Sequence, residues 1–184
     1  MRRSGVNHSL VSSGAFAAGP VGLRGRTGVE AGAFFSGNAI AAVDAEGRLD
    51  LPPFVLDALR RGEGRRLFFG AHPSDPCLAA YAPARREGLY REVERGRLQG
   101  ADEAAHARGA RRAFGYVEES EWSVEGRVTL PPMMRRKGAI GALALLIGAG
   151  PEVEIWSPER ALAADDPQLR EMAAWRLEER ETRR

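Results

Sequence analysis

The sequence predicts an α+β protein, rich in β-strand, made of two copies of one small unit and a C-terminal helix. An internal repeat, the same order of apolar stretches, glycine turns and prolines in each copy, and a charged amphipathic stretch at the end predict this class. We divide the chain into a disordered tail (1–33), a first repeat (34–84), a helical linker (85–114), a second repeat (115–162) and a C-terminal helix (163–184).

The repeat is clearest where Glu46–Pro53 recurs as Glu125–Pro132, with six of eight residues identical at an offset of 79 residues. Downstream, Leu67–Gly70 corresponds to Leu145–Gly148 at an offset of 78, and the last strands correspond at 75. The shrinking offset predicts a shorter loop between the last two strands of the second copy.

Each copy should begin with a hairpin. The apolar stretches 39–43 and 116–122 precede a glycine turn, and the alternating stretches Arg48–Leu51 and Arg127–Leu130 follow it. Alternation on both sides of a short glycine turn is typical of paired antiparallel strands.

Two prolines then close the strand in each copy, and the second suits the first turn of a helix. Short helices are therefore expected over Phe54–Arg61 and Met133–Lys137, each followed by two apolar strands. The order strand, strand, helix, strand, strand thus occurs twice.

The linker and the C-terminus should be helical. Arg85–Arg97 and Asp102–Arg112 are charged and free of proline, which predicts two solvated helices separated at Gly100. The signal Asp165-Asp166-Pro167 predicts the start of a helix over Gln168–Glu181 with one apolar stripe.

Charge gives little indication of a partner, because 27 Lys and Arg against 25 Asp and Glu leave a formal net charge of +2. Residues 1–33 hold four Arg and one Glu, so the remainder is nearly neutral. One such subunit should bind DNA weakly, and affinity would need a local patch repeated by oligomerisation. The tail is rich in Gly, Ala and Ser and is expected to be disordered. Two alternatives are that it is an export or transit signal, or that the start codon is assigned too far upstream.

Composition argues against several other classes. Cys77 is the single cysteine and the three histidines are scattered, which favours a reducing, cytoplasmic compartment and gives no metal-ligand spacing. The longest apolar run, Ala139–Ala149, is about half of the roughly 20 residues that a membrane span needs. No nucleotide-binding glycine motif or catalytic triad spacing is present, so we expect no enzyme, cofactor or small-molecule substrate. Four aromatic residues are expected to pack in a core: Phe54, Tyr81, Trp122 and Trp156.

The segment Asp44-Ala45-Glu46-Gly47-Arg48 is the strongest candidate site. Asp44 can accept backbone N–H groups, Gly47 allows a positive φ, and Arg48 then projects from the start of a strand. Arginine suits phosphate or guanine because its guanidinium is a planar fork of donors. An ordinary hairpin in which Asp44 and Arg48 pair is the alternative, but the motif recurs at 123–127.

Further basic residues follow the second proline pair. Arg135 and Arg136, with Lys137, can be read equally as phosphate contacts or as a solvated helix face. The first copy has apolar and acidic residues there instead.

From Phe34 to about Ala164 the chain resembles the MraZ family. The resemblance rests on motifs in one order: F-x-G at the start, Asp44-x-x-Gly47-Arg48 with Leu51-Pro52, Cys77-Leu78 before Tyr81-x-Pro83, Gly126-Arg127 with Leu130-Pro131, and Ile147-Gly148 before Ile155-Trp156-Ser157.

This resemblance implies tandem AbrB-like swapped-hairpin units in a pseudo-twofold β-barrel. It also implies a sequence-specific DNA-binding repressor of the cell-division and cell-wall gene cluster that binds promoter direct repeats as a ring-like, nucleoid-associated oligomer. The DNA-binding set would be Arg48, Arg127, Gly47, Gly126, Arg135 and Arg136, with Asp44 and Ser123 shaping the turns. The alternative is an assembly module that keeps the duplicated hairpin without binding DNA.

Two departures from the family pattern stand out. Ser123 replaces the expected Asp, so the second turn should be held less firmly. Asp50 lies two residues after Arg48 on the same side of its strand, so the first repeat should bind DNA more weakly than the second. The basic tail could act as an arm on DNA.

Overall fold

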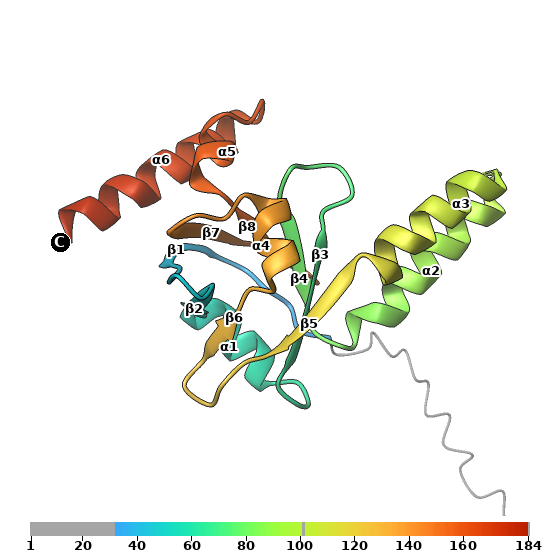
Figure 1. The fold of residues 1–184 in the computed structure, drawn as a ribbon, viewed down its shortest axis with the longest axis horizontal. Helices are drawn as coiled ribbons and strands as arrows, with labels where there is room; N and C mark the ends of the chain where they lie inside the picture. Colours follow the sequence, from blue (N-terminus) through green and yellow to red (C-terminus); the bar gives the residue numbers. More distant parts are fainter. Residues whose placement is uncertain (1–31, 101, 184) are drawn as a thin grey trace, which may run out of the picture.

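Strands from the two repeats interleave in one six-stranded antiparallel sheet, in the order β1-β7-β8-β4-β3-β5 (Figure 1). The computed structural model describes residues 32–100 and 102–183. The first repeat supplies β1 (Asn38–Ala42), β2 (Arg48–Asp50), β3 (Arg66–Ala71) and β4 (Leu78–Tyr81). The second supplies β5 (Val117–Glu121), β6 (Arg127–Thr129), β7 (Leu143–Gly148) and β8 (Val153–Trp156). The predicted α+β class is confirmed.

The sheet has an internal twofold relation. When each strand is exchanged for its counterpart in the other repeat, the same order is read backwards, with β4 and β8 paired at the centre. β1 lies on β7 and β5 lies on β3, so each repeat sends its first strand to the edge of the other repeat's strands.

The prediction that β1 pairs with β2, and β5 with β6, in local hairpins is therefore wrong, although both predicted turns form. Asp44 N–H donates to the Arg48 carbonyl at 3.0 Å, and beyond this bond β1 and β2 part. β2 instead pairs with β6 in a two-stranded ribbon. An isolated two-stranded hairpin is marginally stable, whereas pairing across the repeats satisfies the same backbone groups and gives both strands an apolar partner.

The helices follow the sequence closely. They are α1 (Pro53–Arg60), α2 (Arg85–Leu98), α3 (Glu103–Ala110), a π-helical turn η1 (Arg111–Gly115), α4 (Pro132–Gly138), α5 (Pro158–Leu162) and α6 (Pro167–Thr182). Gly100, with a φ of +95°, lies at the break between α2 and α3 as predicted. The short helix α5 was not predicted, although Ser157 caps it by accepting the Arg160 N–H.

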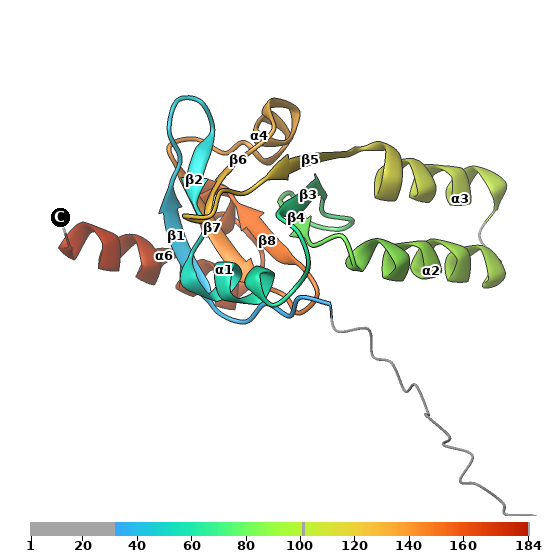
Figure 2. The same ribbon diagram turned by 90° about the horizontal axis from the view of Figure 1, so that it is seen from below.

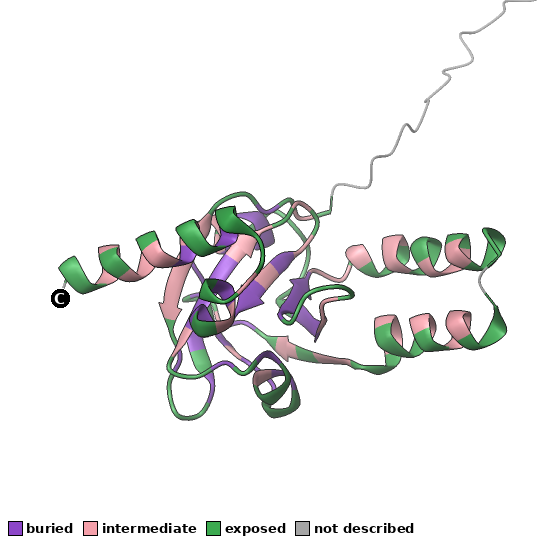
Figure 3. Cartoon of the chain, turned by 90° about the horizontal axis from the view of Figure 1, so that it is seen from above, coloured by how far each residue is buried: buried purple, intermediate pink, exposed green. Residues whose placement is uncertain are grey.

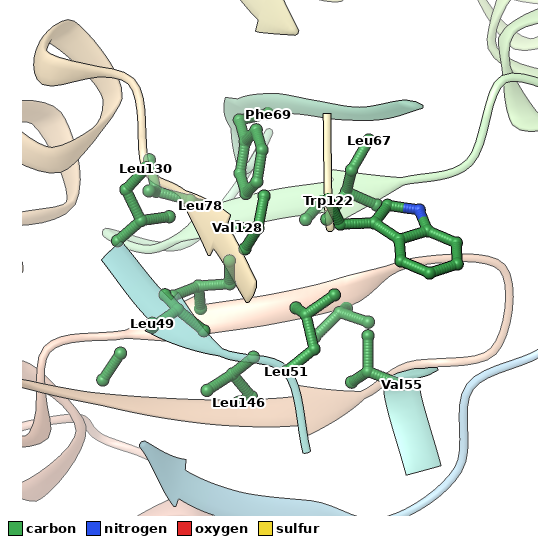
Figure 4. Packing of buried hydrophobic residues seen from close by; sticks show 14 of the residues in the cluster. Leu49, Leu51, Val55, Leu67, Phe69, Leu78, Trp122, Val128, Leu130 and Leu146 are labelled. Carbon is green, nitrogen blue, oxygen red and sulfur yellow. The ribbon is translucent and has the colours of Figure 1, made fainter. Parts of the chain in front are cut away.

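The hydrophobic core is shared by the repeats (Figure 4). Leu49 and Val128 face each other across the β2–β6 ribbon and are each 2% exposed. Of the aromatic residues expected in a core, Tyr81, Trp122 and Trp156 are buried, and Phe54 is half-buried against the main cluster. Neither repeat could bury these side chains alone.

Two helical elements extend from opposite ends of the body (Figures 1 and 2). Helices α2 and α3, which form the α2–α3 arm, contain no buried residue within their described ranges, in contrast to the sheet, where the buried positions concentrate (Figure 3). At the other end, α6 buries Leu169 and Ala173 in a second cluster with Leu145 and Trp156.

Several sequence expectations can be compared with these elements. The β7–β8 loop (149–152) is shorter than the β3–β4 loop (72–77), which confirms the predicted deletion. No helix in the described part of the chain has both the length and the apolar character to cross a membrane. The tail predicted at 1–33 lies outside the described residues except for 32 and 33.

Candidate nucleic-acid interface

The β2–β6 ribbon brings the two predicted arginines onto one outward face. Side chains alternate across a strand, so Leu49 and Val128 point into the core while their neighbours point out. Arg48 lies opposite Thr129 and Asp50 lies opposite Arg127. The two arginines are thus on neighbouring strands, offset by about 7 Å along the ribbon.

The first turn is closed by a carboxylate. Asp44 Oδ1 accepts the Arg48 backbone N–H at 2.8 Å, and the Gly47 N–H donates to the Asp44 carbonyl at 3.0 Å. The same carboxylate accepts Arg48 Nε at 2.7 Å, and this hydrogen bond holds the pKa of Asp44 below its ordinary value of 3.8. Glu46 adds a second ion pair to Arg48 Nη2 at 2.8 Å. Arg48 is therefore paired twice within its own turn.

The second turn has the same backbone and a weaker cap. Gly126 N–H donates to the Ser123 carbonyl at 2.8 Å, and Ser123 Oγ accepts the Arg127 N–H at 3.2 Å. The Ser123 hydroxyl also hydrogen-bonds Glu125, which lowers the pKa of that carboxyl. This cap bond is longer than the one that Asp44 makes in the first turn, and the weaker hold expected of serine stays a prediction.

The glycines are required because each turn packs closely on the other repeat. Gly47 and Gly126 are buried with φ of +85° and +92°, a region that side chains disfavour. A Cβ at Gly47 would lie 3.1 Å from the Leu130 carbonyl oxygen, and one at Gly126 would lie 2.7 Å from Leu56 Cδ2. The carbonyls of both glycines also accept a backbone N–H from the opposite repeat, at 2.9 and 2.8 Å.

Each turn is further anchored by an arginine of the opposite repeat. Arg135 Nη1 donates to the Ala45 carbonyl at 2.8 Å, and Arg60 Nη2 donates to the Val124 carbonyl at 3.1 Å. Ala45 and Val124 are equivalent positions in the two repeats. Arg135 also donates Nε to Ile140 and Nη2 to Gly141, so every nitrogen of its guanidinium is used on a backbone carbonyl.

The turn and ribbon segments carry more carboxylates than arginines, and Arg60 and Arg135, which bind the two turns, offset the difference. Two arginines, Arg48 and Arg127, share the turns and the ribbon with four carboxylates: Asp44, Glu46, Asp50 and Glu125. Asp50 accepts Arg127 Nε at 2.9 Å and Nη2 at 3.5 Å, and this hydrogen bond raises the pKa of Arg127. Among the described residues neither arginine has a hydrogen-bond partner for Nη1. Each guanidinium therefore keeps one nitrogen available.

The structure changes the interpretation of three predicted residues. Asp50 shares a face with Arg48 as expected, but its partner is Arg127, so the carboxylate expected to weaken the first repeat lies against the arginine of the second. Arg135 is half-buried and engaged on carbonyls, whereas Arg136 is exposed with no side-chain partner in the described part of the chain. Arg60 was not assigned to the site from the sequence, since no local pattern links it to a turn 64 positions away.

Two further features of the described residues bear on small-molecule and metal binding. A cavity of about 250 Å³ at the base of the α2–α3 arm is lined mainly by small apolar residues, and Arg85 beside it is paired with Glu92 and Glu152. Among residues 32–100 and 102–183 no group of three His, Cys, Asp or Glu side chains is placed to hold a metal ion.

Similarity to known proteins covers about seven-tenths of the chain. The chain is 31% identical to the transcriptional regulator MraZ of Saccharophagus degradans, over 71% of this chain and 86% of that protein. It is 32% identical to the one from Alcanivorax borkumensis (68% and 84%) and 31% identical to the one from Thermomicrobium roseum (76% and 97%). No protein-family model matches the chain.

Proposed function

Because this chain belongs to the MraZ family of transcriptional regulators, we propose that it binds double-stranded DNA and regulates transcription by occupying a promoter. Curated relatives at 31–32% identity that share most of their length with it support a regulatory role. The names of these relatives state that they regulate transcription. The DNA-binding interface proposed for this chain rests on the geometry of the β2–β6 ribbon.

The β2–β6 ribbon is the observation that carries the proposal. The major groove of B-DNA admits a two-stranded antiparallel ribbon, and outward side chains on such a ribbon can reach base edges. Here the ribbon is rigid, because its inner face is buried and both of its turns are anchored by the opposite repeat. Arg48 and Arg127 are the groups on it that can donate to guanine or phosphate.

The finer parts of the proposal concern architecture and target. Strands of residues 34–84 and 115–162 that pair across the repeats support two tandem AbrB-like swapped-hairpin units, separated by the linker 85–114. We further propose a ring-like, nucleoid-associated oligomer on promoter direct repeats, acting as a repressor of the cell-division and cell-wall cluster. A nearly neutral subunit needs several copies to bind DNA firmly.

Arg48→Ala with Arg127→Ala tests the interface. Genomic fragments retained by the wild-type protein would supply the duplex, and anisotropy at several salt concentrations would measure binding. We expect affinity to fall by at least about tenfold, because each bidentate contact to guanine is worth about that factor. The dependence on salt should also become shallower, since fewer phosphate charges are neutralised.

The matched control is Arg95→Ala with Arg108→Ala, which removes two exposed arginines from the α2–α3 arm. This control should keep wild-type affinity. Equal binding by the Arg48, Arg127 variant and the wild type would refute the interface, and a folded oligomer that retains no duplex would favour the assembly-module alternative.

A further inference from the structure

The two outward-facing residue pairs of the ribbon are equivalent by the repeat but differ in chemistry. Arg48 lies opposite Thr129, and Arg127 lies opposite Asp50. Position 129 is the counterpart of position 50 at the offset of 79 residues. One arginine therefore faces a neutral hydroxyl residue across the ribbon, whereas the other faces a carboxylate that binds it at 2.9 Å.

Asp50 has no part in shaping either turn. The carboxylate of Asp44 accepts a backbone N–H as well as Arg48, so it is needed for the local fold. The side chain of Asp50 hydrogen-bonds Arg127 alone among the described residues. It is 72% exposed and its partner is 60% exposed, so water and other ligands reach the pair from outside.

We propose that Asp50 is a built-in competitor of DNA for Arg127, and that it lowers binding to non-operator duplexes more than binding to the operator. This inference rests on the proposed DNA-binding function. The carboxylate occupies Nε and Nη2 of Arg127, the edge that a phosphate or guanine would otherwise take, and must be displaced or accommodated when the ribbon enters the groove.

Discrimination follows from the chemistry of the groove. A carboxylate is repelled by phosphates and by the acceptor atoms of guanine, and it is accepted where cytosine presents its N4 amino group. A repulsive group of this kind penalises wrong sequences rather than rewarding the right one. Because the pair is exposed, its strength is modest, and a correct site can overcome it.

The repeat supplies its own substitutions for a test. Asp50→Thr copies the residue at position 129, and Thr129→Asp places a carboxylate opposite Arg48. Affinity should be measured for a selected genomic duplex and for a shuffled duplex of equal length, at two or more salt concentrations. Thermal unfolding of each variant should stay close to that of the wild type, since Asp50 is exposed and the half-buried Thr129 makes no side-chain hydrogen bond to the described residues.

We expect Asp50→Thr to raise affinity for the shuffled duplex by about two- to fivefold per contacting subunit, as for loss of one exposed ion pair. The gain for the selected duplex should be smaller, so the ratio of the two affinities falls. Thr129→Asp should weaken binding to both duplexes. In an Arg127→Ala background, Asp50→Thr should have a smaller effect, because the competed group is gone.

The outcomes separate this inference from the function on which it rests. A wild-type protein that binds no duplex overturns both. Wild-type binding with an Asp50→Thr variant of unchanged affinity and unchanged selectivity overturns the inference alone. If Asp50→Thr raises affinity as much in the Arg127→Ala background as in the wild type, the carboxylate acts through general repulsion of DNA and not through its pair with Arg127, which overturns the inference.

Discussion

The turns at 44–48 and 123–127 have one backbone and two sets of side-chain interactions. The first is capped by the carboxylate of Asp44 and anchored by the hydrogen bond from Arg135 to the Ala45 carbonyl, and Arg135 is itself fixed by two further bonds to carbonyls of its own repeat. The second is capped by the hydroxyl of Ser123 and anchored by one hydrogen bond from Arg60. The glycine and its close packing are kept in both, so the repeat preserves what the backbone requires while the side chains that hold it have diverged.

The largest expected difference between the repeats lies in their short helices. Met134 in α4 and Val55 in α1 are equivalent positions, 0% and 1% exposed. Met134→Ala should lower the free energy of unfolding by about 2–5 kcal/mol, because it removes more buried surface and leaves a larger cavity. Val55→Ala should cost about 1–3 kcal/mol. Chemical denaturation would measure both free energies of unfolding, provided that the m-values stay unchanged. A larger loss of stability in Val55→Ala than in Met134→Ala would contradict this prediction.

The anchoring arginines should differ by a smaller amount. Arg135→Ala leaves three carbonyls without their donor and should cost about 1–2 kcal/mol. Arg60 is exposed and makes one such bond, so Arg60→Ala should change stability by less than about 0.5 kcal/mol. Hydrogen exchange at Gly47 should accelerate in Arg135→Ala, with exposed Arg136→Ala as the neutral control. Equal effects of Arg60→Ala and Arg135→Ala would mean that the additional bonds contribute nothing.

The smallest effect concerns the caps and depends on pH. The pKa of Asp44 is lowered by its hydrogen bonds to Arg48, so its contribution to stability is present above pH 3.8 and is lost as the pH falls through the lower folded value. The Arg48 amide resonance should therefore titrate in strong acid. The Arg127 amide, capped by a hydroxyl, should respond less, through Glu125, whose pKa is lowered by its hydrogen bond to that hydroxyl.

Exchange of the two caps sharpens this comparison. Ser123→Asp should make the Arg127 amide titrate in acid, and Asp44→Ser should abolish the titration of the Arg48 amide. An Arg48 amide that still titrates in Asp44→Ser would contradict the assignment of the acid response to the Asp44 cap.

Much of the local structure was readable from the chain. The glycine turns and the helices after each proline pair follow from φ preferences at named residues, and the α2–α3 break at Gly100 follows in the same way. Even the missed helix α5 had a signal, since Ser157-Pro158-Glu159 combines a cap, a proline at the first helical position and an acidic first turn.

By itself, the sequence determined the duplicated unit, the order of its elements, the turns and the two arginines they present, because these depend on neighbours within a few residues. Only the tertiary structure decided that β1 pairs with β7 and not with β2, and that Asp50 forms an ion pair with Arg127. It also decided that Arg135 and Arg60 hydrogen-bond the turns of the opposite repeat. Those contacts depend on which strands pair and in what register. Periodicity within one segment records which face of a strand is buried and carries no information about its partner across the sheet.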